Sequence, residues 1–202
     1  MQLLPIKYFE STQVLQIAEE LLGTIIVTHI NNEVTSGIIV ETEAYAGVTD
    51  KASHAYKGRR TPRNETMYAR GGTVYVYICY GIHDMLNIVT NKENTPDAIL
   101  IRAIEPIEGM EIMQQRTGKF FTDTTITRGP GNVAKALGIR KLHDGISLQN
   151  GAIKIYRNNT VQHFTSITGK GNRIGMETAG EAAKLPYRFF VKDNKYVSRP
   201  NK

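Results

Sequence analysis

The chain has 202 residues, of which 41% are hydrophobic and 22% are charged, and its formal net charge is +6. This length and balance fit one globular domain with a sizeable core and argue against an intrinsically disordered chain. The positive charge favours an anionic partner, nucleic acid or a membrane surface, although charge alone is weak evidence for either.

The chain contains a single cysteine, Cys79, which excludes an internal disulfide and a multi-cysteine zinc site. The five histidines are scattered, with no ligand-spaced pair near other metal-binding residue types. We therefore expect no metal and no cofactor. The first residues, MQLLPIKYFE, lack the pattern of a signal peptide, and no apolar run is long enough to cross a membrane. We expect a soluble protein of the cytoplasm.

The first predicted elements are a helix and a β-hairpin. Ser11 or Thr12 can cap the helix, and Gly23 stands where a left-handed residue would end it. The apolar face of this helix would consist of Val14, Leu15, Ala18, Leu21 and Leu22. Two runs rich in isoleucine and valine follow, Thr24–Ile30 and Val34–Tyr45, and they are predicted to pair as a hairpin.

The segment Ala46–Gly72 differs from its surroundings, because it has few apolar residues and several glycines. Structureless segments of this length are uncommon in a compact domain unless they have a function. We therefore predict a functional loop. It carries a basic cluster of Lys57, Arg59, Arg60, Arg63 and Arg70.

The rest of the chain is predicted to alternate between strands and helices. Strands are expected at Thr73–Tyr80, Met85–Thr90, Ala98–Ile104, Ile153–Tyr156 and Arg188–Lys192. Pro106 is expected to open a helix that runs to about Arg116, and a short helix is expected at Asn132–Leu137. No repeat or clear linker interrupts the pattern, so residues 1–202 are predicted to form a single mixed domain.

Two carboxylates stand near the end of the strand predicted at Val34–Tyr45. Side chains alternate between the faces of a strand, so Glu41, Glu43 and Tyr45 would project to the same side. A face directed to solvent explains this pattern equally well. Paired carboxylates also occur in O-glycosidases, about 5 to 9 Å apart, but there they flank the scissile bond and do not project from one strand.

A run of tyrosines follows the basic loop. Tyr75 and Tyr77 would share one face of their strand. The other face, which can fill a core, carries Val74, Val76 and Ile78. Tyr80 has the parity of the core face unless the strand ends before it, and Gly81 favours such an ending. Tyrosine is a good strand former, so packing with satisfied hydroxyl groups is an alternative to a functional role.

Together, the carboxylates, the basic loop and the tyrosines match the needs of an enzyme that acts on a base in duplex DNA. Such an enzyme must extrude the base, which costs roughly a few kcal/mol. Basic side chains hold the phosphates, and an inserted side chain fills the gap in the stack. Aromatic faces can sandwich the base, at about 1 to 3 kcal/mol per base. A carboxylate then activates water.

A longer series of motifs runs through the chain from the first predicted helix onward. Its central members are ETEAY (Glu41–Tyr45), His54, TPRN (Thr61–Asn64), GTVYVYICYG (Gly72–Gly81), Asn87 and LIRA (Leu100–Ala103). Further members are EPIEG (Glu105–Gly109), GPGNVAKALGI (Gly129–Ile139), AGE (Ala179–Glu181) and PYRFFV (Pro186–Val191). Single motifs of this series are weak evidence, but their order and spacing closely resemble the alkyladenine, or methylpurine, DNA glycosylases.

The resemblance implies which residues carry the chemistry. Glu43 matches the general base of the family, which activates the attacking water, and Arg102 matches a residue that helps hold that water. Glu41 is then expected to be structural and paired with a nearby basic residue. Without the resemblance, Arg102 would be interpreted as an ordinary strand residue paired with a carboxylate.

The resemblance also implies a base pocket and DNA contacts. Tyr45, His54 and Tyr77 match the side chains that line the pocket and stack on the flipped base. Asn87 matches the residue on the pocket floor that helps exclude guanine through its amino group, and Tyr80 matches the residue wedged into the duplex. The segment expected to contact the DNA backbone contains Arg59 and Arg63.

The implied fold is α+β, with a curved, mainly antiparallel β-sheet flanked by helices and a protruding β-hairpin for DNA. The implied enzyme is a monofunctional hydrolase without lyase activity. It would act as a monomer on double-stranded DNA, remove alkylated or deaminated purines and start base excision repair. In a bacterium it would be associated with the nucleoid. The chain departs from the family at Ile82 and His83, where a bulky pair often follows the Tyr-Gly sequence.

Three alternatives to this hypothesis stay open at the level of sequence. A non-catalytic DNA-binding protein could use the same basic loop and tyrosine wedge, and would release no free base. An enzyme that acts on RNA or on free nucleosides could use the same pocket. An O-glycosidase could use Glu41 and Glu43, and would not depend on Tyr80.

Overall fold

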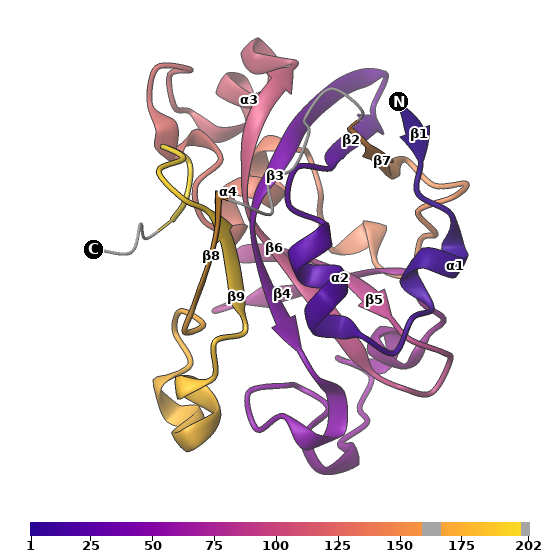
Figure 1. Ribbon diagram of the computed structural model, residues 1–202. Coiled ribbons are helices and arrows are strands. Elements are labelled where there is room, and N and C mark those ends of the chain that lie inside the picture. The colour runs from indigo at the N-terminus through magenta and orange to yellow at the C-terminus, as the bar shows by residue number, and fades with distance from the viewer. Residues whose placement is uncertain (159–166, 199–202) are drawn as a thin grey trace.

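Two long strands, β3 (Glu33–Tyr45) and β6 (Asp97–Glu108), run antiparallel through the middle of the computed structural model, which describes residues 1–158 and 167–198 (Figure 1). They belong to a nine-stranded sheet with the order β1-β7-β2-β3-β6-β5-β4, and β9 and β8 join it at β3. Every strand pair is antiparallel. The other strands are β1 (Gln2–Leu3), β2 (Ile25–Ile30), β4 (Val74–Cys79), β5 (His83–Thr90), β7 (Ile153–Arg157), β8 (Thr168–Gly171) and β9 (Arg188–Val191).

Strand β3 changes its neighbour along its length. Its first half pairs with β2 as far as Ile38, and the stretch Glu41–Glu43 pairs with β9. Between these two partners the register with β6 shifts on either side of Glu41. Such bulges bend a strand and redirect its side chains. The part of β3 that carries the two carboxylates thus pairs with β9, a strand that lies far away in the sequence.

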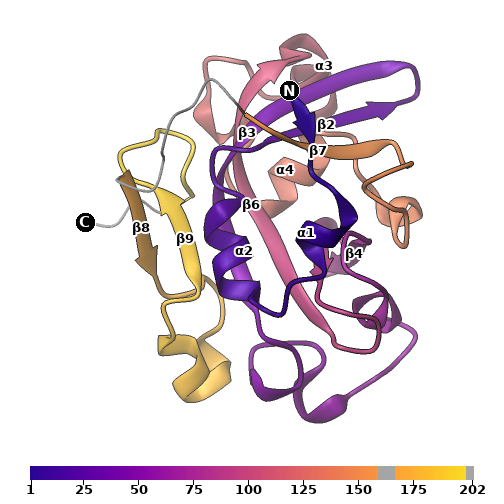
Figure 2. The ribbon, with the colours of Figure 1, turned by 45° about the vertical axis from the view of Figure 1, so that its right-hand side comes forward.

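Helices pack on this sheet. Helix α2 (Val14–Glu20) contacts β3, β6 and β9, and it lies in front of the sheet together with α1 (Ile6–Phe9) in Figure 2. Helix α4 (Pro130–Ala136) packs against β5, β6 and α3 (Met110–Thr117). The fully buried side chains of this core include Phe9, Leu21, Ile26, Ile39, Leu86, Ile88, Ile99, Ile101, Ile104 and Met113. The predicted α+β class, with a curved and mainly antiparallel sheet, is confirmed.

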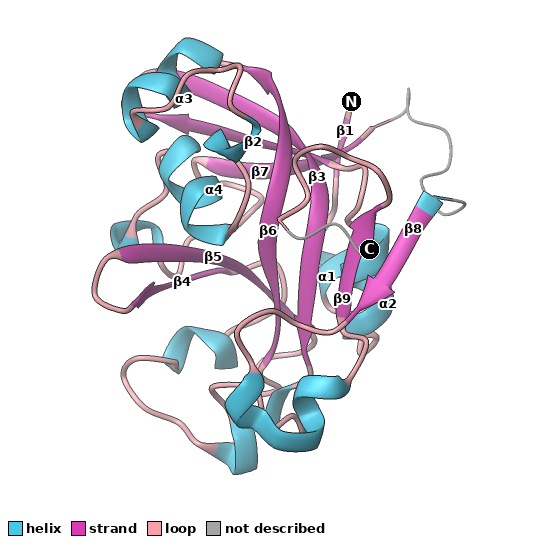
Figure 3. Cartoon of the chain, turned by 90° about the vertical axis from the view of Figure 1, so that its left-hand side faces the viewer, coloured by secondary structure: helices cyan, strands magenta, loops and turns pink. Residues whose placement is uncertain are grey.

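The segment 46–72 is less irregular than predicted. It contains three short 3-10 helices, at Gly47–Thr49, Tyr56–Gly58 and Glu65–Tyr68. A further helical segment, Glu177–Lys184, lies beside it, and the two segments form the group of short helices at the bottom of Figure 3. Fully buried Ala55 and nearly buried Met67 anchor the loop in a small second core.

Some sequence-based boundaries are wrong. Pro106 opens no helix, because it lies in β6 opposite Gly37, where a residue without an N–H group is tolerated at the end of a strand. Helix α3 begins after Gly109, whose φ of 76° and close approach to the carbonyl oxygen of Val34 leave no room for a side chain. Gln13, and neither Ser11 nor Thr12, precedes α2.

Other predictions hold with small changes. The β2–β3 hairpin is present, and its turn residues Asn31 and Asn32 both adopt positive φ. Gly23 follows the first helix with a φ of 85°, as expected. Strand β8 and the short elements β1 and α1 were not predicted, because none of them shows a clear hydrophobic period.

Two kinds of feature are absent from the described residues. No helix in the described ranges is long and apolar enough to span a membrane. In the same ranges, no group of histidine, cysteine and carboxylate side chains is placed to hold a metal ion.

Candidate active site

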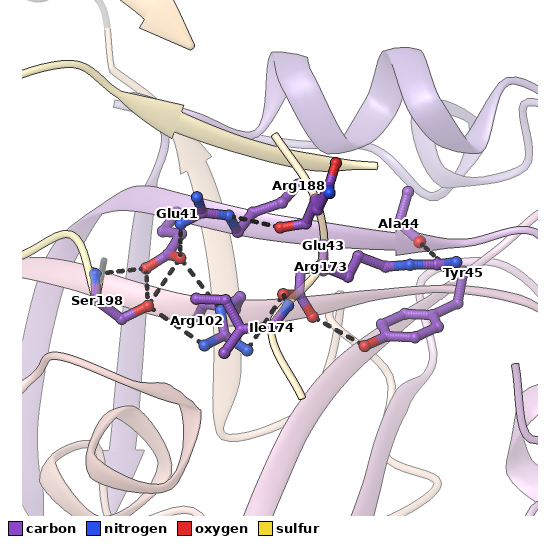
Figure 4. A network of polar contacts seen from close by, with 10 residues as sticks. Glu41, Glu43, Ala44, Tyr45, Arg102, Arg173, Ile174, Arg188 and Ser198 are labelled. Atoms are coloured by element: carbon purple, nitrogen blue, oxygen red, sulfur yellow. Dashed lines mark hydrogen bonds and ion pairs between the residues drawn. The ribbon is translucent and has the colours of Figure 1, made fainter. Parts of the chain in front are cut away.

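Glu43 lies on β3 opposite Leu100 of β6, and its carboxylate is fully buried. Figure 4 shows the contacts of its two oxygens. Oε2 accepts a hydrogen bond of 2.8 Å from the Tyr45 hydroxyl group, and Oε1 accepts one of 2.8 Å from the backbone N–H of Ile174. Nη1 of Arg102 lies 3.3 Å from Oε1 as an ion pair. The alternative of a face directed to solvent is therefore excluded for this carboxylate.

Burial raises the pKa of Glu43 above its ordinary value, against the opposing effects of Arg102, the Ile174 N–H and the Tyr45 hydroxyl group. A general base works best when its pKa approaches the working pH, because it then combines ionisation with a strong affinity for the proton. Desolvation thus makes Glu43 a stronger base than an exposed glutamate, while the three donors keep its ionised form accessible.

Glu41 is also fully buried, but all its contacts tie it to the protein. Its carboxylate accepts hydrogen bonds from Arg102 Nε at 3.2 Å and from Arg188 Nη1 at 3.1 Å. The backbone N–H and the hydroxyl group of Ser198 donate to it as well, with distances between 2.6 and 2.8 Å (Figure 4). The expected partnership with a basic residue is confirmed. Arg102 lies between the two glutamates, so the carboxylates do not flank an open gap as an O-glycosidase requires.

A small cavity lies on the other side of Tyr45. It has a volume of about 40 Å³, and its wall includes the four predicted pocket residues Tyr45, His54, Tyr77 and Asn87. The remaining lining residues are Ala52, Met67, Tyr75, Ala98 and Met176.

The aromatic side chains of the cavity contact one another. The ring of His54 meets that of Tyr77 edge-on at 4.6 Å, and His54 Nδ1 lies 2.9 Å from the Tyr75 hydroxyl group. Burial lowers the pKa of His54, and the nearby Arg63 and Arg59 lower it further. The imidazole is therefore neutral near pH 7. Asn87 is nearly buried and donates to the backbone carbonyl oxygens of Tyr75 and Met85 at 3.3 and 3.2 Å.

Tyr45 is held from behind by a buried ion pair that the sequence did not reveal. Arg173 forms an ion pair with Asp50, with Nη2 2.9 Å from Oδ1, and also donates to the carbonyl oxygen of Ala44 at 2.8 Å. The Arg173 guanidinium lies over the Tyr45 ring, 4.8 Å from its centroid. These contacts fix the ring whose hydroxyl group donates to Glu43.

An outer groove of about 400 Å³ adjoins the cavity, and both are lined by Ala52, His54 and Met176. Arg59, Arg63 and Lys51 also line this groove. Arg63 donates to the carbonyl oxygen of Ile78 at 3.2 Å, and its guanidinium lies 5.7 Å from the Tyr77 ring centroid. The two arginines predicted to contact DNA therefore lie at the mouth of the aromatic cavity.

The turn between β4 and β5 exposes its side chains. Strand β4 ends at Cys79, so Tyr80 leaves the core parity and is 90% exposed. Tyr80 and Gly81 both have positive φ, 50° and 75°, in a tight turn closed by the Ile82 N–H and the Cys79 carbonyl oxygen at 3.1 Å. A tyrosine in this backbone region is strained, and such strain is concentrated at functional positions. Ile82 is 74% exposed beside it.

Several residues of the site were missed by sequence reasoning. Ile174, Met176 and Arg173 come from one segment, and Ser198 follows β9. They reach the site only through folding, across 123 to 157 positions of the chain. No local pattern of hydrophobicity or turn residues marks them.

Known proteins resemble this chain in sequence. A family model for methylpurine-DNA glycosylase (MPG) matches residues 8–195. A Chlamydia abortus protein is 43% identical over 190 residues, which cover 94% of this chain and 98% of that protein. A Clostridium perfringens protein is 42% identical over 199 residues, covering 95% and 97%. Both are named "Putative 3-methyladenine DNA glycosylase".

The matched residues include Glu41 and Glu43, the lining of the aromatic cavity and the β4–β5 turn. They also include Ile174 and β9. The two relatives match over nearly their full lengths as well. The chain therefore belongs to the methylpurine-DNA glycosylase family, whose members hydrolyse N-glycosyl bonds in DNA.

Proposed function

We propose that this glycosylase flips an alkylated or deaminated purine out of duplex DNA and hydrolyses its bond to the sugar with Glu43 as general base. The observation that carries the proposal is the position of Tyr45. Its ring lines the aromatic cavity, and its hydroxyl group donates to the Glu43 carboxylate. A base that stacks on this ring would present its sugar carbon next to the carboxylate.

The outer surface suits the flipping step. Arg59 and Arg63 at the cavity mouth can hold phosphates of the lesion strand. Tyr80 stands at the tip of the β4–β5 turn with most of its surface free to enter the stack. An aromatic side chain in the vacated position offsets part of the unstacking cost of about a few kcal/mol.

The chemical step would begin when Glu43 removes a proton from a water molecule. The water oxygen forms a bond to the sugar carbon, the glycosidic bond breaks, and the purine leaves with the bonding electrons. Arg102 Nη1 lies at the same carboxylate oxygen as the Ile174 N–H and is placed to help hold this water, as the family resemblance implies. The sugar gains positive charge as the glycosidic bond lengthens, and the Glu43 carboxylate stabilises this charge until it takes up the proton of the water.

We expect purines of different charge to bind the cavity with different affinities. Alkylated purines such as 3-methyladenine carry positive charge, which suits stacking between aromatic faces and makes them good leaving groups. Neutral purines such as hypoxanthine depend more on hydrogen bonds from the cavity wall. Asn87, on the strand below the rings, is placed to reject the exocyclic amino group of guanine.

The same geometry supports a monofunctional enzyme. Among the described residues that line the cavity none is a lysine, so no amine is placed there to attack the sugar and form a Schiff base. One chain supplies all the groups named above, and we propose that the monomer is active. Its expected location, with the DNA of the cytoplasm, stays a prediction.

An excision assay under single-turnover conditions tests the proposal. Duplex oligonucleotides with 3-methyladenine, hypoxanthine or ethenoadenine should release free base, and the strand should break only after alkali. Single-stranded RNA and free nucleosides should be poor substrates. Release of no base from any duplex would favour the non-catalytic DNA-binding alternative, and strand breakage without alkali would contradict the monofunctional mechanism.

A further inference from the structure

The Glu41 carboxylate is surrounded by polar groups of the protein. Its two oxygens accept from four donor groups, namely Nε of Arg102, Nη1 of Arg188, and the N–H and hydroxyl groups of Ser198. The carboxylate has no solvent exposure, and all four of these donors belong to the protein. Burying a charged group costs free energy even when it has many partners, so stability alone does not explain the presence of Glu41.

The arrangement around Arg102 indicates that role. Its guanidinium is nearly buried and has a different partner at each nitrogen: Nε faces Glu41 at 3.2 Å, Nη2 faces the Ser198 hydroxyl group at 3.3 Å, and Nη1 faces Glu43 at 3.3 Å. The guanidinium group is planar, so hydrogen bonds that hold two of its nitrogens also fix the direction of the third nitrogen. Figure 4 shows Arg102 between the two glutamates, with Ser198 beside it.

We propose that Glu41 is a positioning residue of the glycosylase, which together with Ser198 holds Arg102 so that Nη1 stays directed at the Glu43 carboxylate. The inference rests on the proposed role of Glu43 as general base. In this arrangement Glu41 and Ser198 touch neither base nor sugar. They act through Arg102 alone.

The proposal also has an electrostatic consequence. Among the described residues, Arg102 and Arg188 form the ion pairs with Glu41 and Glu43, and the formal charges of these four groups cancel. Removing the charge of Glu41 would leave one positive charge in excess beside Glu43. Opposite charge favours the ionised carboxylate, so the pKa of Glu43 would fall. The base would then ionise at lower pH but would bind a proton less strongly.

The primary test is Glu41→Gln in single-turnover excision of a hypoxanthine duplex, measured from pH 4 to pH 9, with the affinity for lesion duplex measured in parallel. We expect the plateau rate to fall about 10- to 100-fold, as for a slightly displaced catalytic group. The acid limb of the profile should move to lower pH. Lesion affinity should stay close to that of the unchanged protein, because Tyr45, His54 and Tyr77 are untouched. An unchanged rate and an unchanged pH profile would overturn the proposal.

Glu105→Gln is the matched control. Glu105 is a carboxylate of β6 that binds the chain segment after β9, because Asn194 Nδ2 donates to it at 2.7 Å. This variant loosens the same segment without touching Arg102, so its rate and pH profile should not change. Equal losses in Glu105→Gln and Glu41→Gln would assign the effect to general loosening and would overturn the proposal.

Ser198 provides a second route if Glu41→Gln does not fold. Ser198→Ala removes one hydroxyl group that contacts both Glu41 and Arg102, and we expect a smaller loss of rate, about 3- to 10-fold. Ser198→Thr keeps the hydroxyl group and should restore most of the rate. A folded Ser198→Ala protein with full activity would contradict the proposal. Full excision by Glu43→Gln would instead overturn the proposed function itself.

Discussion

The buried glutamate pair and the exposed β4–β5 turn serve one proposed reaction but are built in opposite ways. Glu41 and Glu43 have no solvent exposure, and their oxygens meet donors from four separated parts of the chain. Tyr80 is almost fully exposed and is held in place by a strained backbone conformation. Hydrogen bonds and ion pairs to the carboxylates orient the first region, and the backbone conformation of the turn orients the second.

This difference fits the role that we propose for each region. A carboxylate that activates water gains from fixed dipoles and low solvent access, because no energy is then spent on reorganisation during the reaction. A side chain that enters duplex DNA must be free of protein contacts before it meets the DNA. Strain in a short turn satisfies this need, since it points the ring outward without any bond that must break.

The largest effect should come from Glu43→Gln, which keeps the shape of the buried region and removes the base. We expect excision of hypoxanthine to fall by about 10²- to 10⁴-fold, the usual contribution of a general base. Binding to lesion duplex should persist, because the cavity and the turn are unchanged. Single-turnover excision and fluorescence anisotropy with the same oligonucleotide measure the two quantities. An excision rate close to that of the unchanged protein would remove Glu43 from the mechanism.

A smaller effect is expected for Tyr80→Gly at the other region. The loss of the ring should lower excision from duplex DNA about tenfold or more, since the gap in the stack is no longer filled. Excision from single-stranded DNA should change little. Glycine also accepts the positive φ at this position, so the free energy of unfolding should rise or stay constant, by up to about 1 kcal/mol. Ile82→Ala, the neighbouring exposed residue, serves as the control. Equal losses on duplex and single-stranded DNA would refute the wedge.

The third prediction concerns the pH dependence of the excision rate. Burial raises the pKa of Glu43, so the ionised base is lost as the pH falls through a range above that of an ordinary glutamate. We expect the excision rate of a neutral lesion to decline, over that higher range, to a small fraction of its plateau. Lesion binding should keep a flatter profile, because His54 stays neutral to lower pH than a free histidine. An acid limb at the ordinary glutamate pKa would contradict this account of burial.

The smallest effect concerns stability. Because the pKa of Glu43 is raised in the folded protein, its ionisation opposes folding. This cost is absent below the pKa of the unfolded chain, grows as the pH rises and is complete above the folded pKa. Glu43→Gln should therefore melt at a higher temperature than the unchanged protein near pH 7, and the difference should shrink at acid pH. Calorimetry at several pH values measures it, and a difference that grows at acid pH would reverse the assigned sign.

Local patterns predicted the parts of the molecule that have local causes. The β2–β3 hairpin, the end of β4 before Tyr80 and the strand that carries Glu43 all follow from alternation and turn residues. The helix expected at Pro106 failed because tertiary pairing with Gly37 continues the strand beyond the proline. A proline permits a helix start but does not require one.

The candidate site also has parts that local sequence patterns predict and parts that they do not. The gathering of Tyr45, His54, Tyr77 and Asn87 around one cavity agrees with the series of motifs, although their proposed roles stay predictions. Burial of the two glutamates could not be predicted, because β9 and the residue Ser198 cover them from far along the chain. Sequence alone also left open whether Glu41 faced solvent, since strand alternation is disturbed by the bulge beside it.

The change of neighbour along β3 has a consequence for synthesis of the protein. Ile174 meets Glu43 across 131 positions of the chain, and Ser198 meets Glu41 across 157. Contacts of such sequence separation form late, because a long loop must close first. A nascent chain that has left the ribosome only as far as β6 already carries both glutamates, but not the groups that order them. Synthesis therefore delivers the exposed β4–β5 turn early and completes the surroundings of the two glutamates only after β9 has docked.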